Sequence, residues 1–166
     1  MSVYLSKIGS FFAMFSQDMT FILSLLLLFW ASTLYFGKGK IVSFILSFYP
    51  ATFLYKSFPF IDKLTFLTGD KLVVVNKLGL FLLFSIPIYI IINSYVFSVS
   101  EYTGTSHLVR GGALAIASLV TVMLFYYTTL DLSIFHDFGP RIDSLFAGNN
   151  LVFYWNLGVI AILAIF

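Results

Sequence analysis

The sequence has no cysteine among its 166 residues and few charged side chains. Without a thiol, the chain holds no disulfide, no thiolate nucleophile and no cysteine-bound zinc or iron–sulfur cluster. Charged residues make up 10% of the chain, whereas a soluble domain carries roughly a quarter. The nine basic side chains exceed the seven acidic ones by only two, and they are scattered rather than gathered in a stripe. These shortages exclude a soluble globular enzyme, a disordered chain and a nucleic-acid-binding protein.

The residues that are present point to a membrane. Hydrophobic residues make up 60% of the chain, including 21 Phe and 10 Tyr, which is more apolar surface than one small domain buries internally. A hydrocarbon core of about 30 Å needs roughly 20 helical residues to cross it. The charge-free intervals therefore predict an all-α, polytopic transmembrane helical bundle of about five spans, with four spans plus a re-entrant segment as the alternative. The spans are expected in a single membrane domain covering residues 1–166, at about 19–37, 41–61, 78–100, 111–130 and 147–166. The second is charge-free only over residues 41–55, and it extends to residue 61 if the Lys56 side chain reaches the headgroups.

Three connecting or flanking segments are expected to lie outside these spans. Residues 1–17 place their apolar side chains on one helical face, which predicts an amphipathic helix lying in the membrane interface. The four residues Gly-Lys-Gly-Lys at 37–40 predict a tight hairpin turn between the first two spans. Asp62–Lys77 has a turn signal at Thr68-Gly69-Asp70 between two β-prone runs, so a hairpin, a re-entrant segment and an interfacial loop all stay open there.

The span at 111–130 has a face of small side chains. Residues of this kind at spacings of four let two helix backbones approach closely. We therefore expect a tight helix–helix contact on this face, and the pattern leaves open whether the partner is in the same chain or in another copy. The helix-packing residues are Gly111, Gly112, Ala113, Ala115, Ala117 and Thr121.

Polar groups inside the expected spans are weak ones. No Asp, Glu or Arg occurs in these intervals, and this counts against a proton- or ion-coupled pump, whose path is usually marked by ionisable groups. Most Ser and Thr hydroxyls in membrane helices bond back to their own helix. Asn93 and Asn156 carry amides that need interhelical partners, and together with Ser85 and Thr121 they are the candidate lining of a pore.

The densest polar group of the sequence lies in the loop before the last span. Its members, Asp131, His136, Asp137, Arg141 and Asp143, are residue types that serve metal or acid–base sites. Their spacing does not match that of a metallohydrolase, because no His-x-x-x-His pair is present. A cluster of interfacial residues paired at the headgroup level is the favoured interpretation, and no metal or cofactor is expected.

One stretch resembles a known family. Residues 18–60 contain an apolar span, the Gly37-Lys38-Gly39-Lys40 turn and then IVSFILSFYPATFLY. This arrangement is similar to the opening of the colicin V production protein family. The resemblance implies a small inner-membrane protein linked to secretion and envelope homeostasis, and it supplies no catalytic residues.

These observations favour a non-enzymatic integral membrane protein that acts by assembly. It would associate with itself or serve as a small subunit of an envelope or secretion-related complex in the bacterial cytoplasmic (inner) membrane. Its expected partners are the lipid bilayer and other membrane subunits or copies of itself, and not nucleic acid. The first alternative is a pore or passive transporter. The second is a membrane enzyme that acts on lipid headgroups through the loop cluster.

Overall fold

The computed structural model describes residues 17–61, 70–96, 106–129, 138–146 and 148–165, and all regular structure in these ranges is helical. This confirms the predicted all-α fold. The expected interfacial helix at 1–17 lies, except for its last residue, outside the described residues. The helices are α2 (Gln17–Phe36), α3 (Lys38–Ser57), α4 (Asp70–Val96), α5 (Ser106–Thr128), α6 (Pro140–Phe146) and α7 (Asn149–Ile165).

Within the described ranges, three helices are long and apolar enough to cross a membrane. Their apolar stretches are Asp18–Phe36 in α2, Leu72–Tyr95 in α4 and Leu108–Thr128 in α5. The apolar stretch of α7, Asn150–Ile165, is shorter. The protein is therefore membrane-embedded and helical, as predicted, and the count of five spans stays a prediction.

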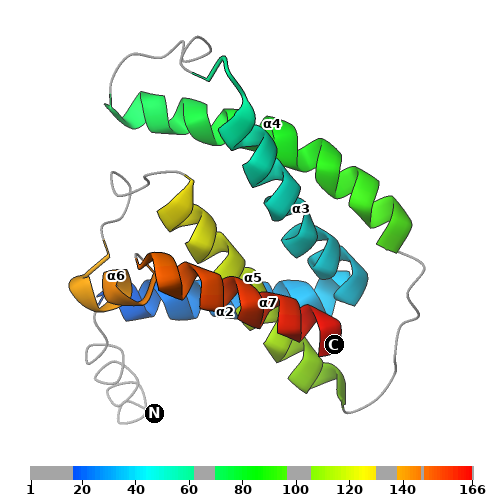
Figure 1. Cartoon of the computed structure of the whole chain (residues 1–166). Coiled ribbons are helices and arrows are strands. Elements are labelled where there is room, and N and C mark those ends of the chain that lie inside the picture. The colour runs from blue at the N-terminus through cyan, green and yellow to red at the C-terminus, as the bar shows by residue number, and fades with distance from the viewer. Residues whose placement is uncertain (1–16, 62–69, 97–105, 130–137, 147, 166) are drawn as a thin grey trace, which may run out of the picture.

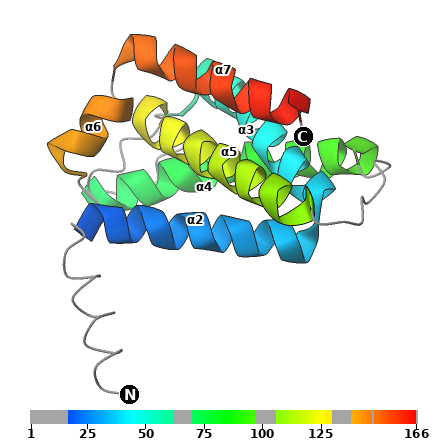
Figure 2. The ribbon, with the colours of Figure 1, turned by 90° about the horizontal axis from the view of Figure 1, so that it is seen from below.

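The helices form two packed groups that share α3 (Figure 1). In the first group, α5 lies between α2 and α7, as Figure 2 shows from below. In the second group, α3 and α4 run side by side. Because α3 also packs against α5, it connects the two groups.

Two buried clusters hold these groups together. The larger one joins α3, α5, α6 and α7, with Ile45, Leu114 and Met123 among its most buried members. The smaller one is aromatic and joins α3, α4 and α5. Its centre is the Phe81–Phe125 pair, whose ring centroids are 3.9 Å apart. Ring contacts across three helices therefore fix the position of α4 against α5 as well as against α3.

The structure corrects the predicted boundaries of two helices. The helix α4 begins at Asp70 rather than Leu78, so the second half of the segment expected to be non-spanning is helical. The β-prone run at 72–75 joins the helix because β propensity is weak, while a helix satisfies its own backbone groups in an apolar medium. The helix α3 ends at Ser57 rather than Ile61, since Pro59 disfavours helical geometry at Phe58, which is extended.

The connection between α2 and α3 is shorter than the predicted turn. Gly37 alone separates the two helices, and Lys38 and Lys40 already belong to the first turn of α3. Gly37 has φ 83° and ψ 165°, a conformation open essentially to glycine alone, and its N–H donates to the Thr33 carbonyl at 3.1 Å. This residue allows α3 to leave α2 at a corner (Figure 1).

We predict that Gly37→Ala destabilises the fold by about 1–3 kcal/mol, because a Cβ is strained at this φ and ψ. The measurement is equilibrium unfolding in detergent micelles titrated with SDS, followed by helical circular dichroism. Gly112→Ala is the control, since a Cβ there meets no atom within 4 Å and alanine favours a helix. Equal losses of stability in the two variants would contradict the special role of Gly37.

Candidate functional site

The small-residue face of α5 lies at contacts within the same chain. A Cβ built on Gly111 would lie 3.5 Å from the Leu34 side chain and 3.6 Å from Trp30 Nε1, both on α2. Ala115 and Ala117 are completely buried, and Ala117 belongs to the cluster that includes Ile41 and Ile45 of α3. The small side chains therefore serve the packing of α5 against α2 and α3.

Two members of the predicted face lie away from the close contact. A Cβ on Gly112 would meet no atom within 4 Å, and Ala113 is only half-buried. On a helix, Gly112 is turned by about 100° from Gly111, and Ala113 by about 160°. The spacing of four predicts two rows, and the structure places Gly111 of one row against α2 and Ala117 of the other in the cluster with α3.

Buried hydroxyls are satisfied within their own helices. Ser118 Oγ donates to the Leu114 carbonyl at 2.9 Å, and Thr121 Oγ1 donates to the Ala117 carbonyl at 2.8 Å. On α3, Ser43 and Ser47 do the same. Such bonds satisfy the buried hydroxyl within its own helix, so it does not need a partner on a neighbouring helix. The hydroxyls between α3 and α5 therefore act mainly as small packing groups.

The Tyr49 hydroxyl differs from these. It is buried and faces the side chain of Thr121 across the α3–α5 contact. Thr121 already donates to Ala117, and the Tyr49 oxygen has no hydrogen bond of ordinary geometry with the described residues. The Tyr49 hydroxyl is therefore a buried polar group without a hydrogen bond in the mainly apolar α3–α5 contact.

The structure distributes the candidate pore residues over separate helices. Ser85 lies on α4, where its hydroxyl is 3.4 Å from the Leu82 carbonyl, and Asn156 lies on α7, where Nδ2 donates to the Val152 carbonyl at 2.7 Å. Asn93 is also on α4, but its buried Oδ1 has no hydrogen-bond partner in the described part of the chain. Because α4 packs on α3 while α7 packs on α5, these groups do not gather around a common axis.

A short helix absent from the sequence-based prediction closes one end of the molecule. Pro140 is the first residue of α6, a position that suits proline because its missing N–H has no helical partner. The Gly139 N–H just before it donates to Asp18 Oδ2 of α2 at 2.9 Å. Tyr127 Oη of α5 donates to Asp143 Oδ1 of α6 at 2.6 Å. These two carboxylates attach α6 to the ends of α2 and α5.

Stacked rings reinforce the same end. The Tyr127 and Phe146 rings are 5.9 Å apart and nearly parallel, and the Phe146 and Trp155 rings are 5.3 Å apart in the same arrangement. Trp155 Nε1 also donates to the Leu145 carbonyl at 2.8 Å. Aromatic side chains with one polar atom are typical of the membrane–water interface. We interpret this group as an interfacial anchor that joins α5, α6 and α7.

Most of the predicted loop cluster lies outside the part of the chain that the structure describes. Asp131, His136 and Asp137 lie outside the described residues, and Arg141 is in α6 with a side chain that is not described. Asp143 accepts a hydrogen bond from Tyr127 of α5, a residue outside the predicted cluster. Within the described ranges, no group of three or more His, Asp or Glu side chains is arranged to hold a metal ion.

Sequence reasoning missed one residue because of the corrected start of α4. The charge-free intervals leave Lys77 at the end of the segment expected outside the spans, whereas the structure places it inside the apolar stretch Leu72–Tyr95. The signal that identifies it is the apolar run Leu72–Val75, which precedes the lysine and continues the helix toward the N-terminus. A lysine inside a candidate span is a functional candidate in its own right.

No protein-family model matches this chain, and no curated protein or solved structure proved similar to it. The resemblance to the colicin V production protein family therefore stays a prediction.

We predict that Ala117→Leu destabilises the protein by about 1–3 kcal/mol, because three added carbons have no space in the buried α3–α5 contact. Ala161→Leu is the matched control on the exposed side of α7. Unfolding in SDS-titrated micelles measures both changes. A loss at Ala161 as large as that at Ala117 would show that the α5 face is not closely packed.

We predict that Tyr127→Phe costs about 1–2 kcal/mol, because it removes the hydrogen bond to Asp143 and keeps the ring stack. Tyr154→Phe, at an exposed position on α7, should change stability by less than about 0.5 kcal/mol. Thermal unfolding followed by near-ultraviolet circular dichroism compares the two. An unchanged midpoint for Tyr127→Phe would show that Asp143 does not hold α6 in place.

Proposed function

We propose that this chain is a non-enzymatic membrane protein that acts by assembly, through docking of α4 on a helix of another polypeptide. The partner is a second copy or another subunit of an envelope complex in a bacterial inner membrane. Asp143, the member of the predicted loop cluster whose side chain is described, is bonded to Tyr127, and this favours a structural over a catalytic role for that carboxylate.

The packing of α4 supports this proposal. The helix packs extensively on α3, and Phe81 also reaches the Phe125 ring of α5. Much of its remaining surface is apolar and exposed, including Leu83 at 64% and Ile90 at 60%. A lipid-facing helix also looks like this, so the apolar surface alone does not distinguish lipid from a protein partner.

The observation that carries the proposal is the amide of Asn93. Its Oδ1 is buried and has no hydrogen-bond partner among the described residues, although the residue as a whole is half-exposed. Hydrocarbon chains offer no donor or acceptor, so an unpaired amide on a membrane helix is costly. The proposal therefore requires this side chain to rotate, so that the amide bonds a helix of the partner. Amides of this kind stabilise pairs of membrane helices by about 1–2 kcal/mol.

This proposal places the assembly contact on α4 and not on α5. The sequence leaves open whether the small-residue face of α5 meets the same chain or another copy, and the structure buries Ala115 and Ala117 within the chain. An assembly partner therefore has to use a different surface, and α4 combines an exposed apolar face with an unpaired amide.

We expect that Asn93→Leu weakens the assembly about fivefold to thirtyfold, as the loss of one interhelical amide bond implies. Native mass spectrometry of the complex, extracted gently from its own membrane, measures the change. Asn156→Leu is the matched control because the Asn156 amide bonds within its own helix and should leave the assembly unchanged.

The native mass also identifies the partner. Multiples of the chain mass mean self-association, and a fixed ratio to other polypeptides means a subunit role; either result supports the proposal if Asn93→Leu disrupts it. A monomer at every concentration, together with ion or solute flux through purified protein in liposomes, would overturn assembly in favour of the pore.

A further inference from the structure

Lys77 lies on the packed side of α4. It follows the buried Val74 by three residues and precedes the buried Phe81 by four, and residues at these spacings share a helical face. The side chain is half-buried. Because it stands five residues after Leu72, the lysine begins about 8 Å inside the apolar stretch, at a rise of 1.5 Å per residue. The charge is thus held close to neighbouring helices and not in open solvent.

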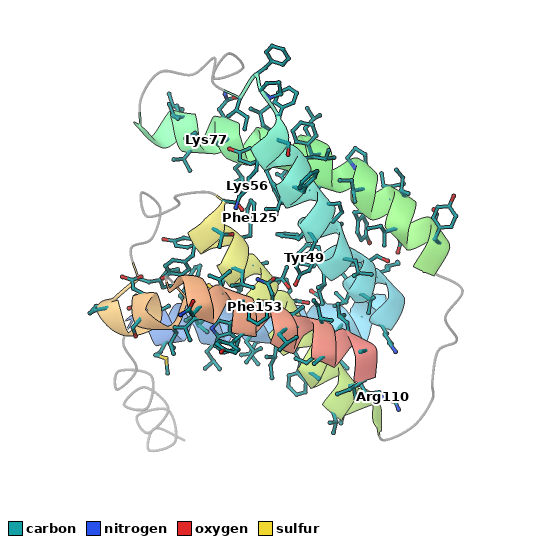
Figure 3. The ribbon with its side chains drawn as sticks, viewed as in Figure 1. Tyr49, Lys56, Lys77, Arg110, Phe125 and Phe153 are labelled. Carbon is teal, nitrogen blue, oxygen red and sulfur yellow. The ribbon has the colours of Figure 1, made fainter. Side chains whose placement is uncertain are left out.

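A second lysine lies on the adjacent helix. Lys56 is in the last turn of α3, directly after Tyr55, whose ring centroid is 6.2 Å from that of Phe81. Figure 3 shows Lys56 and Lys77 together with Phe125, where the α3–α4 pair faces the C-terminal end of α5. Lysines from two neighbouring helices therefore lie next in sequence to, or one turn from, the Tyr55–Phe81 ring contact.

Neither lysine forms an ion pair with a described residue. The carboxylates with described side chains are occupied elsewhere, since Asp18 accepts from Gly139 and Asp143 accepts from Tyr127. Two like charges repel each other, and an ammonium group within an apolar stretch is costly without a counter-charge. The two lysines therefore need a counter-anion, and neither Asp18 nor Asp143 supplies it.

We propose that Lys56 and Lys77 bind the phosphate of an anionic phospholipid. An ammonium group is a compact donor well suited to phosphate, and basic positions between membrane helices bind lipid headgroups. The apolar surroundings favour an amphiphile over a free ion. On α3, Phe53 lies one turn before Lys56 and is 71% exposed, so it provides surface for an acyl chain. This proposal is independent of the assembly through Asn93.

The experiment uses the purified full-length chain in neutral detergent. Phosphatidylglycerol and phosphatidylcholine with identical acyl chains are titrated separately, and native mass spectrometry counts the lipids bound. The wild type should bind phosphatidylglycerol more tightly than phosphatidylcholine. Lys56→Ala and Lys77→Ala should each reduce this preference about fivefold. Lys38→Ala, with the same change of charge at the other end of α3, should retain it.

Two further arms make the result decisive. Lys77→Arg keeps the charge and should retain most of the preference for phosphatidylglycerol, whereas Lys77→Gln should lose it. A circular dichroism spectrum like that of the wild type shows that each variant is folded. Since Lys56 is exposed, Lys56→Ala tests the site even if changes at Lys77 disturb the fold.

Three outcomes would overturn the proposal. The first is equal binding of the two lipids by the wild type. The second is an equal loss of preference in Lys38→Ala, which would indicate only a general effect of charge. The third is complete competition by inorganic phosphate at concentrations equal to those of the lipid, which would indicate a free-anion site.

Discussion

Helices in a bilayer gain no hydrophobic driving force from meeting each other, so their association depends on how closely their surfaces fit. Here that constraint is met by α5, which packs against α2, α3 and α7 at once. Part of its contact surface is kept small by Gly111, Ala115, Ala117 and Ser118, and large buried side chains such as Leu114 and Met123 fill the rest. The position of α3 follows from this contact, and α4 is placed in turn by its packing on α3 and by the ring of Phe125.

The same close packing determines which polar groups are available for function. Ser118 and Thr121 fit at the contact because each bonds back to a carbonyl of its own helix and leaves no unsatisfied group behind. Asn93 and Lys77 on α4 differ, since an amide has both a donor and an acceptor and an ammonium group carries a full charge. Neither the amide oxygen nor the lysine finds a partner in the described residues. Two of the three residues proposed to act in function, Asn93 and Lys77, therefore lie on α4.

The sequence predicts some of this and misses other parts for physical reasons. Hydropathy and charge place α2 and α5 within a few residues, because length and apolarity are local properties that the bilayer imposes on each span. Charge-free intervals give the wrong start for α4, because the interval begins after Lys77 whereas the helix already begins at Asp70. The small residues of α5 indicate a close contact, yet the choice of α2 and α3 as partners depends on the path of the whole chain. The contacts of α6 with Asp18 and Tyr127 join residues far apart in sequence, which no local pattern reveals.

The two proposed roles of α4 act at different depths. Lys77 and Asn93 are sixteen residues apart on one helix, which at 1.5 Å per residue separates them by about 24 Å along its axis. This distance is most of the thickness of a hydrocarbon core, so in a membrane-spanning α4 the proposed lipid site and the proposed assembly contact would lie toward opposite leaflets. A headgroup bound at Lys77 would fix one end of α4 against α3 and α5, while a partner at Asn93 would fix the other. Because α4 packs mainly on α3, a bound lipid and a partner helix would each add contacts to the sides of α4 that α3 does not cover.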